Sequence, residues 1–141
     1  MIDAQSTVPV TLDGACHCGQ ITFEAEVDPD KTSVCHCTDC QTLSGAPYRA
    51  SVAAAPSAFR VLTGELATYV KVADSGNRRV QTFCSRCGSP IYSTAEGDPT
   101  AMLNIRLGVV RQRNELTPKR QIWTHSRQHW ITDLPAIPEQ A

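Results

Sequence analysis

The side chains with the greatest capacity for chemistry in this sequence are its seven cysteines, which occur in three tight clusters. The clusters are Cys16 with Cys18, then Cys35 with Cys37 and Cys40, and finally Cys84 with Cys87. Cysteines separated by one or two residues are too close to form relaxed disulfides with each other, but a turn between them directs two sulfurs at one ion. Thiolate-rich sites suit zinc or iron rather than magnesium or calcium. The spacing therefore predicts metal binding, and we favour zinc.

The central cluster, CHCTDC at residues 35–40, argues against two other cysteine chemistries. Covalent haem attachment requires a histidine directly after the second cysteine of a C-x-x-C pair, whereas Gln41 follows Cys40. A thioredoxin-like redox pair at Cys37 and Cys40 would need a helix start within a strand-helix-strand unit. The segments around the cluster instead show the pattern of short alternating strands. Haem attachment is therefore excluded, and a redox pair is disfavoured.

Counting ligands divides the seven cysteines into four and three. Structural zinc usually takes four protein ligands, whereas catalytic zinc usually takes three and leaves one position for water or substrate. A glycine, Gly19 or Gly88, follows each cysteine pair and can take a positive φ that bends the backbone around an ion. The two pairs can thus form one closed site and leave the triplet open. The spacing also allows a single four-thiolate site that uses Cys37 and Cys40 and leaves other thiols free.

The overall composition limits the class of protein. A chain of 141 residues with 41 % hydrophobic content fits one domain, which we place at 1–141 with its core at about 12–135. Lys plus Arg total 13 against 14 for Asp plus Glu, so the net charge is −1 and no nucleic-acid partner is expected. The sequence has neither the ~18–20 apolar residues of a membrane span nor a signal-peptide pattern. Because an odd number of cysteines fits a secreted disulfide framework poorly, we expect a cytoplasmic protein with no membrane partner.

Alternation of apolar and polar residues predicts a mainly β fold in a single domain. The clearest strand is QITFEAEV at 20–27, in which every second residue is apolar. Further short strands are expected at 66–72, 80–83, 90–93 and 101–107. No long amphipathic helix is expected, and residues 56–59 and 125–130 are expected to form single turns.

Four stretches of the sequence resemble one protein family. They are GACHCGQITFEAEV at 14–27, CHCTDCQTLSGAP at 35–47, TGELATYV at 63–70 and FCSRCGSPIY at 83–92. With the order and spacing of all seven cysteines, they make the chain similar to the glutathione-dependent formaldehyde-activating enzymes and their relatives of the centromere protein V type. The resemblance implies a zinc-dependent carbon-sulfur lyase that adds a glutathione-like thiol to a small aldehyde, formaldehyde in the family reaction, and reverses the addition. It also implies short antiparallel sheets held by zinc, similar to the fold of a zinc-binding Rab exchange factor.

The resemblance further assigns the cysteines to two zinc ions per chain. It implies a structural zinc at Cys16, Cys18, Cys84 and Cys87, and a catalytic zinc at Cys35, Cys37 and Cys40. Two zinc ions on seven thiolates change the formal charge by +4 − 7 = −3, from −1 to about −4. A thiol with two carboxylates then needs cations nearby, because guanidinium pairs bidentately with carboxylate. The candidate substrate contacts are Arg49, Arg78, Arg79 and Arg106, together with Ser44 and Tyr48 just after the triplet.

The C-terminal part of the chain departs from the family pattern. LGVVRQR at 107–113 lacks the expected glycine followed by a Leu-Asp type pair, and Gln121 stands where histidine is common. These departures bear on the identity of the thiol and the aldehyde. Two other functions remain open: a non-catalytic zinc protein that uses its β scaffold for binding, and a redox sensor whose triplet loses zinc and forms a disulfide.

Several residues near the motifs are expected to have structural roles. His17 and His36 lie between cysteines of one cluster, where a neighbouring side chain usually points away from the ion. Trp123, Trp130 and His125 are expected to close a small core.

Overall fold

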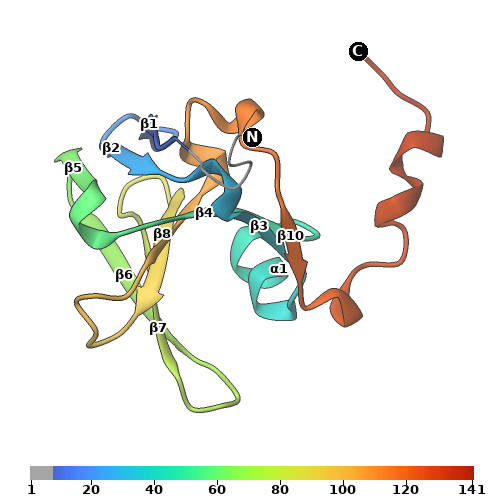
Figure 1. Cartoon of the computed structure of the whole chain (residues 1–141). Helices are drawn as coiled ribbons and strands as arrows, with labels where there is room; N and C mark the ends of the chain where they lie inside the picture. Colours follow the sequence, from blue (N-terminus) through green and yellow to red (C-terminus); the bar gives the residue numbers. More distant parts are fainter. Residues whose placement is uncertain (1–7) are drawn as a thin grey trace, which may run out of the picture.

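Ten β-strands form two sheets in the computed structural model, which describes residues 8–141 (Figure 1). The smaller sheet has the order β1-β2-β5 and joins β1 (Val10–Ala15), β2 (Thr22–Val27) and β5 (Phe59–Thr63) in antiparallel pairs. The larger sheet has the order β10-β3-β4-β9-β8-β7-β6. Its strands are β3 (Thr32–Cys35), β4 (Arg49–Ala54), β6 (Leu66–Val72), β7 (Arg78–Cys84), β8 (Pro90–Ala95), β9 (Leu103–Arg106) and β10 (Arg120–Ile122). The mainly β fold is confirmed, while the first seven residues of the expected 1–141 domain lie outside the described part.

The larger sheet has one apolar face and one polar face. Neighbouring residues on a strand point to opposite sides, so residues paired across strands share a face. On one face Val52 pairs with Ile105, and both belong to a buried cluster that includes Phe23 of the smaller sheet. On the other face Ser51 pairs with Arg106. The apolar face therefore forms the core between the sheets, and the polar face remains for a functional site.

Alternation identified half of these strands. The predicted segments 20–27, 66–72, 80–83, 90–93 and 101–107 coincide with or overlap β2, β6, β7, β8 and β9. The pattern misses β4 because both of its faces are buried, with Arg49 and Ser51 on one side and Val52 and Ala54 on the other. It misses β10 because three residues are too few to show a period. The expected single turns appear as 3-10 turns at Pro56–Ala58 and Thr124–Ser126.

A short helix, α1 (Thr38–Ser44), follows directly after Cys37 and corrects the sequence-based expectation for this segment. Cys37 is the N-cap residue, and its sulfur accepts a hydrogen bond from the Cys40 backbone N–H at 3.2 Å. Gly45 ends the helix with a φ of 68°. The triplet thus stands at a helix start. The expected strands are present on either side, as β3 and β4, but the sequence pattern did not reveal the helix between them, because seven residues are too few to show its period. The strands on either side, β3 and β4, are antiparallel, so this unit still differs from a thioredoxin-like strand-helix-strand crossover.

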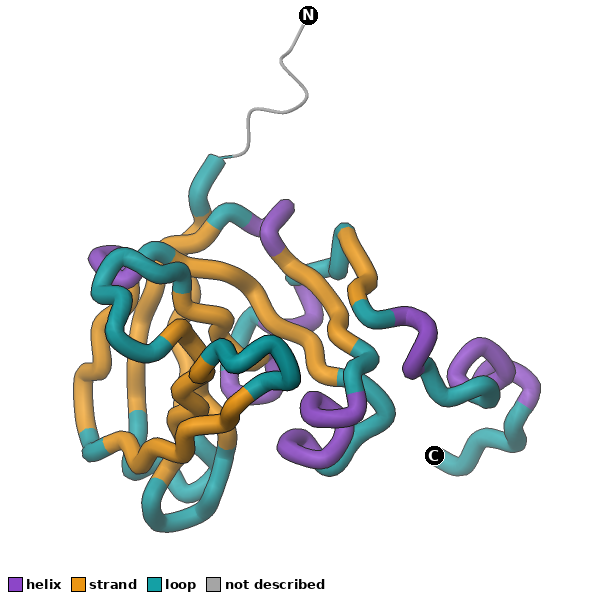
Figure 2. The backbone as a smooth tube through the Cα atoms, turned by 90° about the horizontal axis from the view of Figure 1, so that it is seen from below, coloured by secondary structure: helices purple, strands orange, loops and turns teal. Residues whose placement is uncertain are grey.

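The segment after β10 leaves the two sheets and runs away from them (Figures 1 and 2). It contains 3-10 turns at Thr124–Ser126 and Ile131–Ala136. Trp123 is 57 % exposed, Trp130 is 39 % exposed and His125 is also exposed, so the expectation that they close a small core is wrong. None of the three belongs to the buried hydrophobic cluster, and Trp123 borders the cavity that contains Cys35, Cys37 and Cys40. In residues 8–141, no helix has the length and apolar character to cross a membrane.

Candidate metal centres and the adjoining cleft

Four cysteines from the two pairs converge at one end of the molecule. Cys16 and Cys18 lie in the turn between β1 and β2, while Cys84 ends β7 and Cys87 lies in the turn before β8. Their four sulfurs all lie within 4.8 Å of one another. The Cys18 sulfur is 3.6 Å from that of Cys16 and 3.7 Å from that of Cys84. The cluster therefore connects two hairpins that are far apart in the sequence.

The backbone around this cluster is arranged to hold thiolates. The N–H of Ile21 donates to the Cys16 sulfur at 3.2 Å, and the N–H of Arg86 donates to the Cys84 sulfur at 3.3 Å. Gly19 and Gly88 have φ values of 84° and 81°, as their positions after each pair predict. A hydrogen bond with the Ser89 side chain, supported by backbone donors, lowers the pKa of the Cys87 thiol to about 5.

The geometry of the four sulfurs fits zinc. Tetrahedral zinc with Zn–S bonds of about 2.3 Å separates its sulfur ligands by about 3.8 Å. The sulfur-sulfur distances of 3.6 and 3.7 Å agree with that separation. Four cysteine sulfurs can also supply the complete ligand set of one tetrahedral ion. Cys37 and Cys40 lie in a different group, so the four-thiolate site built on them, which the spacing allowed, does not form here.

The cysteine triplet forms a second group, also with its sulfurs within 4.8 Å of one another. Cys35 ends β3, Cys37 caps α1 and Cys40 lies in the first turn of that helix. The pKa of the Cys40 thiol is lowered to about 5, first by a hydrogen bond with Cys35. A hydrogen bond with Cys37 and the nearby positive charges of Arg49 and Arg106 contribute to the same shift. In residues 8–141, no fourth side chain of a metal-binding type joins this group. Three thiols that share one point suit a metal with an open coordination position.

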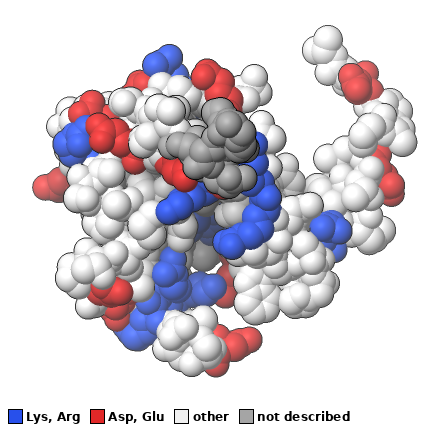
Figure 3. All heavy atoms as spheres, viewed as in Figure 1, with Lys and Arg blue, Asp and Glu red and all other residues white. Residues whose placement is uncertain are grey.

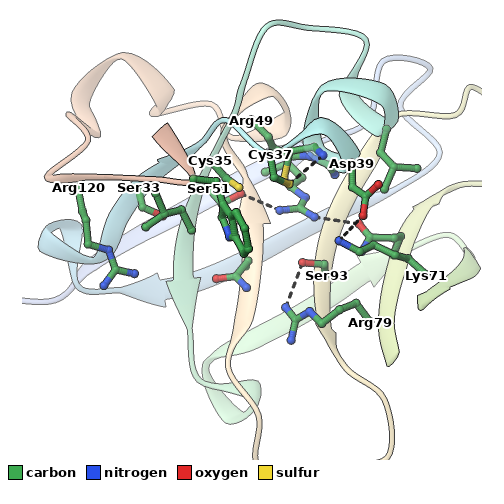
Figure 4. Close-up of a pocket in the computed structure, with 17 residues that line it drawn as sticks. Ser33, Cys35, Cys37, Asp39, Arg49, Ser51, Lys71, Arg79, Ser93 and Arg120 are labelled. Carbon is green, nitrogen blue, oxygen red and sulfur yellow. Dashed lines mark hydrogen bonds and ion pairs between the residues drawn. The ribbon is translucent and has the colours of Figure 1, made fainter. Parts of the chain in front are cut away.

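The triplet opens into a cleft of about 280 Å³ whose floor is the polar face of the larger sheet (Figure 4). The register of the sheet decides which residues form that floor. Cys35 lies opposite Arg49, Ser51 lies opposite Arg106, and Ser93 lies opposite both Asn104 and Gln81. Helix α1 contributes Asp39, Cys40 and Leu43 to the same cleft, and its N-cap residue, Cys37, also lines it. The cleft thus brings the triplet together with side chains from all seven strands of the larger sheet.

Cations dominate this cleft. Figure 3 shows Lys and Arg side chains gathered around a hollow on this side of the molecule. The cations that line the cleft are Arg49, Lys71, Arg79, Arg106 and Arg120. Asp39 is the one acidic residue among the described side chains that line it, and its carboxylate is paired with Lys71 at 2.8 Å. The remaining cations have no carboxylate partner inside the cleft, so the site has an excess of positive charge.

Two arginines carry this excess beneath the triplet. Arg49 is only 6 % exposed, and its Nε and Nη2 atoms are buried without a hydrogen-bond partner. Arg106 donates from Nη1 to the Ser51 hydroxyl at 2.9 Å and from Nη2 to the Gln81 side-chain oxygen at 3.0 Å. Burial, together with the positive charge of Arg49, lowers the pKa of Arg106 to about 9. Neither guanidinium group is therefore paired with a carboxylate among the residues that line the cleft.

The structure separates the candidate substrate contacts into two sets. Arg49, Arg79 and Arg106 line the cleft beside the triplet. Arg78 is exposed and paired with Glu96, and it does not line this cleft. Ser44 and Tyr48 do not line this cleft and border a second cavity, beside Gly108 and Val109, which Arg49 and Arg106 also line. Sequence reasoning missed Lys71, Ser51 and Arg120. For Ser51 there was an unused signal, because Arg49 and Ser51 are polar residues at alternate positions of β4.

The two histidines between cysteines have different environments. His17 is exposed at the turn. His36 is only 2 % exposed and lines another cavity, on the opposite side of β3 from Cys35. Its Nε2 is hydrogen-bonded to Gln121 Oε1 at 2.8 Å, while its Nδ1 is buried without a partner. Neither histidine belongs to the sulfur groups, in agreement with the expectation that both point away.

Comparison with known proteins identifies the family of this sequence. The model of the family described as "Glutathione-dependent formaldehyde-activating enzyme" matches residues 11–126. A search among curated proteins found no match. The crystal structure of a protein from Rhodobacter sphaeroides is similar in fold, with a TM-score of 0.60 and 20 % sequence identity. The similarity covers 77 % of this chain and 98 % of that one.

Proposed function

This chain belongs to the glutathione-dependent formaldehyde-activating enzyme family, and we propose that it is a zinc-dependent carbon-sulfur lyase acting on a glutathione-like thiol and a small aldehyde. The observation that carries the proposal is the contrast between the two sulfur groups. Four thiols form a complete ligand set, whereas three thiols face a cationic cleft. Under this proposal the chain holds two zinc ions, one structural and one catalytic, with the assignments given above for the seven cysteines.

The reaction adds the thiol across the carbonyl group. The sulfur forms a bond to the carbonyl carbon, the π bond of the carbonyl breaks, and the thiol proton ends on the former carbonyl oxygen. With formaldehyde the product is a hydroxymethyl thioether, and the lyase direction is the reverse of these changes. A zinc ion held by Cys35, Cys37 and Cys40 would supply Lewis acidity toward the carbonyl oxygen or favour the thiolate form of the substrate.

The residues of the cleft would mainly position the two reactants. Thiols add readily to unhindered aldehydes, so holding the reactants together supplies much of the rate gain. A glutathione-like thiol carries two carboxylates, which guanidinium groups bind bidentately. Arg120 and Arg79 border the cleft on different strands and are suited to this role. The Lys71 ammonium is already paired with Asp39 and forms part of the wall instead.

A rate measurement tests the proposal directly. Protein loaded with zinc should increase adduct formation between glutathione and at least one small aldehyde above the spontaneous rate, and Cys40→Ser should return it to that rate. Far-UV circular dichroism should show that this variant is folded, because the four-sulfur group is unchanged. If zinc-loaded protein accelerates the reaction of no small thiol with any small aldehyde, the proposal is wrong and a binding role becomes the better explanation. Loss of one zinc per chain on mild peroxide treatment would instead indicate the redox sensor.

A further inference from the structure

Arg49 is a buried cation whose partner is missing from the described part of the chain. No hydrogen bond or ion pair joins its guanidinium to any side chain in residues 8–141, and two of its nitrogens are fully buried. Arginine has five N–H donors in a fixed plane and remains charged at neutral pH. A buried charge without a partner costs several kcal/mol. The arrangement therefore points to an anion that arrives with a ligand.

Arg106 lies on the neighbouring strand and faces the same part of the cleft. Its Nη1 and Nη2 are held by the neutral oxygens of Ser51 and Gln81, while its Nε is buried without a partner. Neutral acceptors fix the plane of the guanidinium but leave its charge unbalanced. Because β4 pairs with both β3 and β9, Arg49 and Arg106 form a two-cation surface directly below the triplet.

The metal site itself cannot balance this charge. One divalent ion on three thiolates contributes −1, and the Lys71–Asp39 pair contributes zero. Arg49, Arg79 and Arg106 together contribute +3, which leaves +2 even before the exposed Arg120 is counted. A ligand with more than one negative group is therefore favoured.

The position of Arg49 indicates that the anion it binds belongs to the carbonyl reactant and not to the thiol. Arg49 lies opposite Cys35, so a group on its guanidinium lies close to whatever reacts at the triplet. In glutathione both carboxylates are separated from the sulfur by four or more bonds. Arg120 lies opposite Ser33, and Ser33 is two residues, or about 6.6 Å, from Cys35 along β3. Arg120 is therefore placed to bind one of these distant carboxylates. Figure 4 shows Arg49 beside Cys35 and Cys37, whereas Arg120 and Ser33 lie at one end of the cleft.

We propose that Arg49 and Arg106 form a carboxylate subsite beneath the cysteine triplet, and that the carbonyl substrate is a small oxo acid rather than formaldehyde. The inference rests on the proposed thiol-addition function and specifies its second reactant. With glyoxylate, the simplest such aldehyde, the sulfur bonds to the aldehyde carbon, the carbonyl π bond breaks and the thiol proton moves to the oxygen. The carboxylate remains unchanged on the adjacent carbon. No oxidant or reductant is needed.

Binding of two inert analogues tests the subsite without requiring turnover. S-carboxymethylglutathione resembles the adduct with glyoxylate, and S-(2-hydroxyethyl)glutathione replaces the added carboxylate with a neutral group of similar size. Calorimetry on zinc-loaded protein should show about 10- to 100-fold tighter binding of the carboxymethyl compound, as expected for charge-assisted hydrogen bonds. Arg49→Met and Arg106→Gln should each reduce this preference by most of that factor. Arg60→Met, which alters an exposed arginine paired with Glu24 on the smaller sheet, should leave the preference unchanged.

The outcomes separate this inference from the proposed function. Equal binding of the two analogues by wild-type protein, or a preference that persists in both cleft variants, would overturn the subsite. If Arg49→Met weakens the binding of both analogues equally, Arg49 pairs with a carboxylate of the thiol, and the oxo-acid inference is also wrong. Because methionine removes an unpaired buried charge, Arg49→Met should fold with unchanged or higher stability, and Arg106→Gln provides a second variant.

Kinetics then test the substrate class. Glyoxylate and glycolaldehyde differ in having a carboxylate or a hydroxymethyl group beside the aldehyde. After subtraction of the spontaneous rate, glyoxylate should be favoured in kcat/KM by about 10- to 100-fold, and Arg49→Met should remove that advantage. Equal acceleration of both aldehydes would contradict the oxo-acid inference while leaving the lyase function intact. A carboxymethyl binding preference without catalysis of any aldehyde would support the subsite and contradict the lyase function.

Discussion

Replacement of Cys84 by serine should unfold this protein, because Cys84 is the buried anchor of the four-sulfur group. Its side chain is 0 % exposed, and its sulfur accepts backbone N–H groups from Arg86 at 3.3 Å and Cys87 at 3.4 Å. The group connects the β1–β2 turn to the β7–β8 turn. Structural zinc contributes apparent binding energies of about 10–16 kcal/mol at neutral pH. Loss of even half of this binding energy, about 5–8 kcal/mol, is comparable to the entire net stability of a typical domain, about 5–15 kcal/mol.

Cys35→Ser is the matched control, since it changes the same chemical group in the open triplet. We expect wild-type protein to hold two zinc ions by elemental analysis, and Cys35→Ser to hold one while remaining folded. Cys84→Ser should show no cooperative urea transition by far-UV circular dichroism, even with excess zinc. A Cys84→Ser variant that keeps two zinc ions and unfolds within about 1 kcal/mol of wild type would refute the division of the cysteines into a closed and an open site.

Three further predictions test the core, the buried histidine and the cleft. Gly14→Ala should lower the free energy of unfolding by about 1–3 kcal/mol in urea titrations, because the new methyl group would overlap a neighbouring backbone carbonyl and a buried ring; an unchanged midpoint would contradict this. Gln121→Ala should cost about 1–3 kcal/mol by the same measurement, since it leaves His36 Nε2 unpaired, and Gln121→Asn provides a milder comparison. Arg79→Met should raise KM for glutathione in adduct formation by about 5- to 10-fold, the effect expected for loss of a partly solvated charge contact. Arg78→Met should change that KM less than twofold, and equal effects would show that the cleft is misassigned.

The family, the mainly β fold and the presence of cysteine clusters that could hold a metal were accessible from local pattern. Alternation revealed strands with one buried face, such as β2, because their period is visible in the sequence. It failed for β4, which is buried on both faces, and for α1, whose seven residues are capped by Cys37 and Gly45 rather than marked by a long apolar stripe. The residue types alone suggested that Trp123 and Trp130 close a core, and they could not show that both side chains are exposed.

What the sequence by itself determined is the supply of ligands: seven thiols, in clusters whose short spacing favours a shared ion, with glycines where the backbone must turn. Ligand counting left two groupings of these clusters open, and the tertiary structure decided between them, because the packing of two hairpins brings the sulfurs of Cys18 and Cys84 within 3.7 Å of each other. The cleft was decided in the same way. Arg49 and Arg106 lie beneath the triplet because the register of β3, β4 and β9 places them on one face. Strand register depends on long-range pairing and burial, which the local order of residues does not encode.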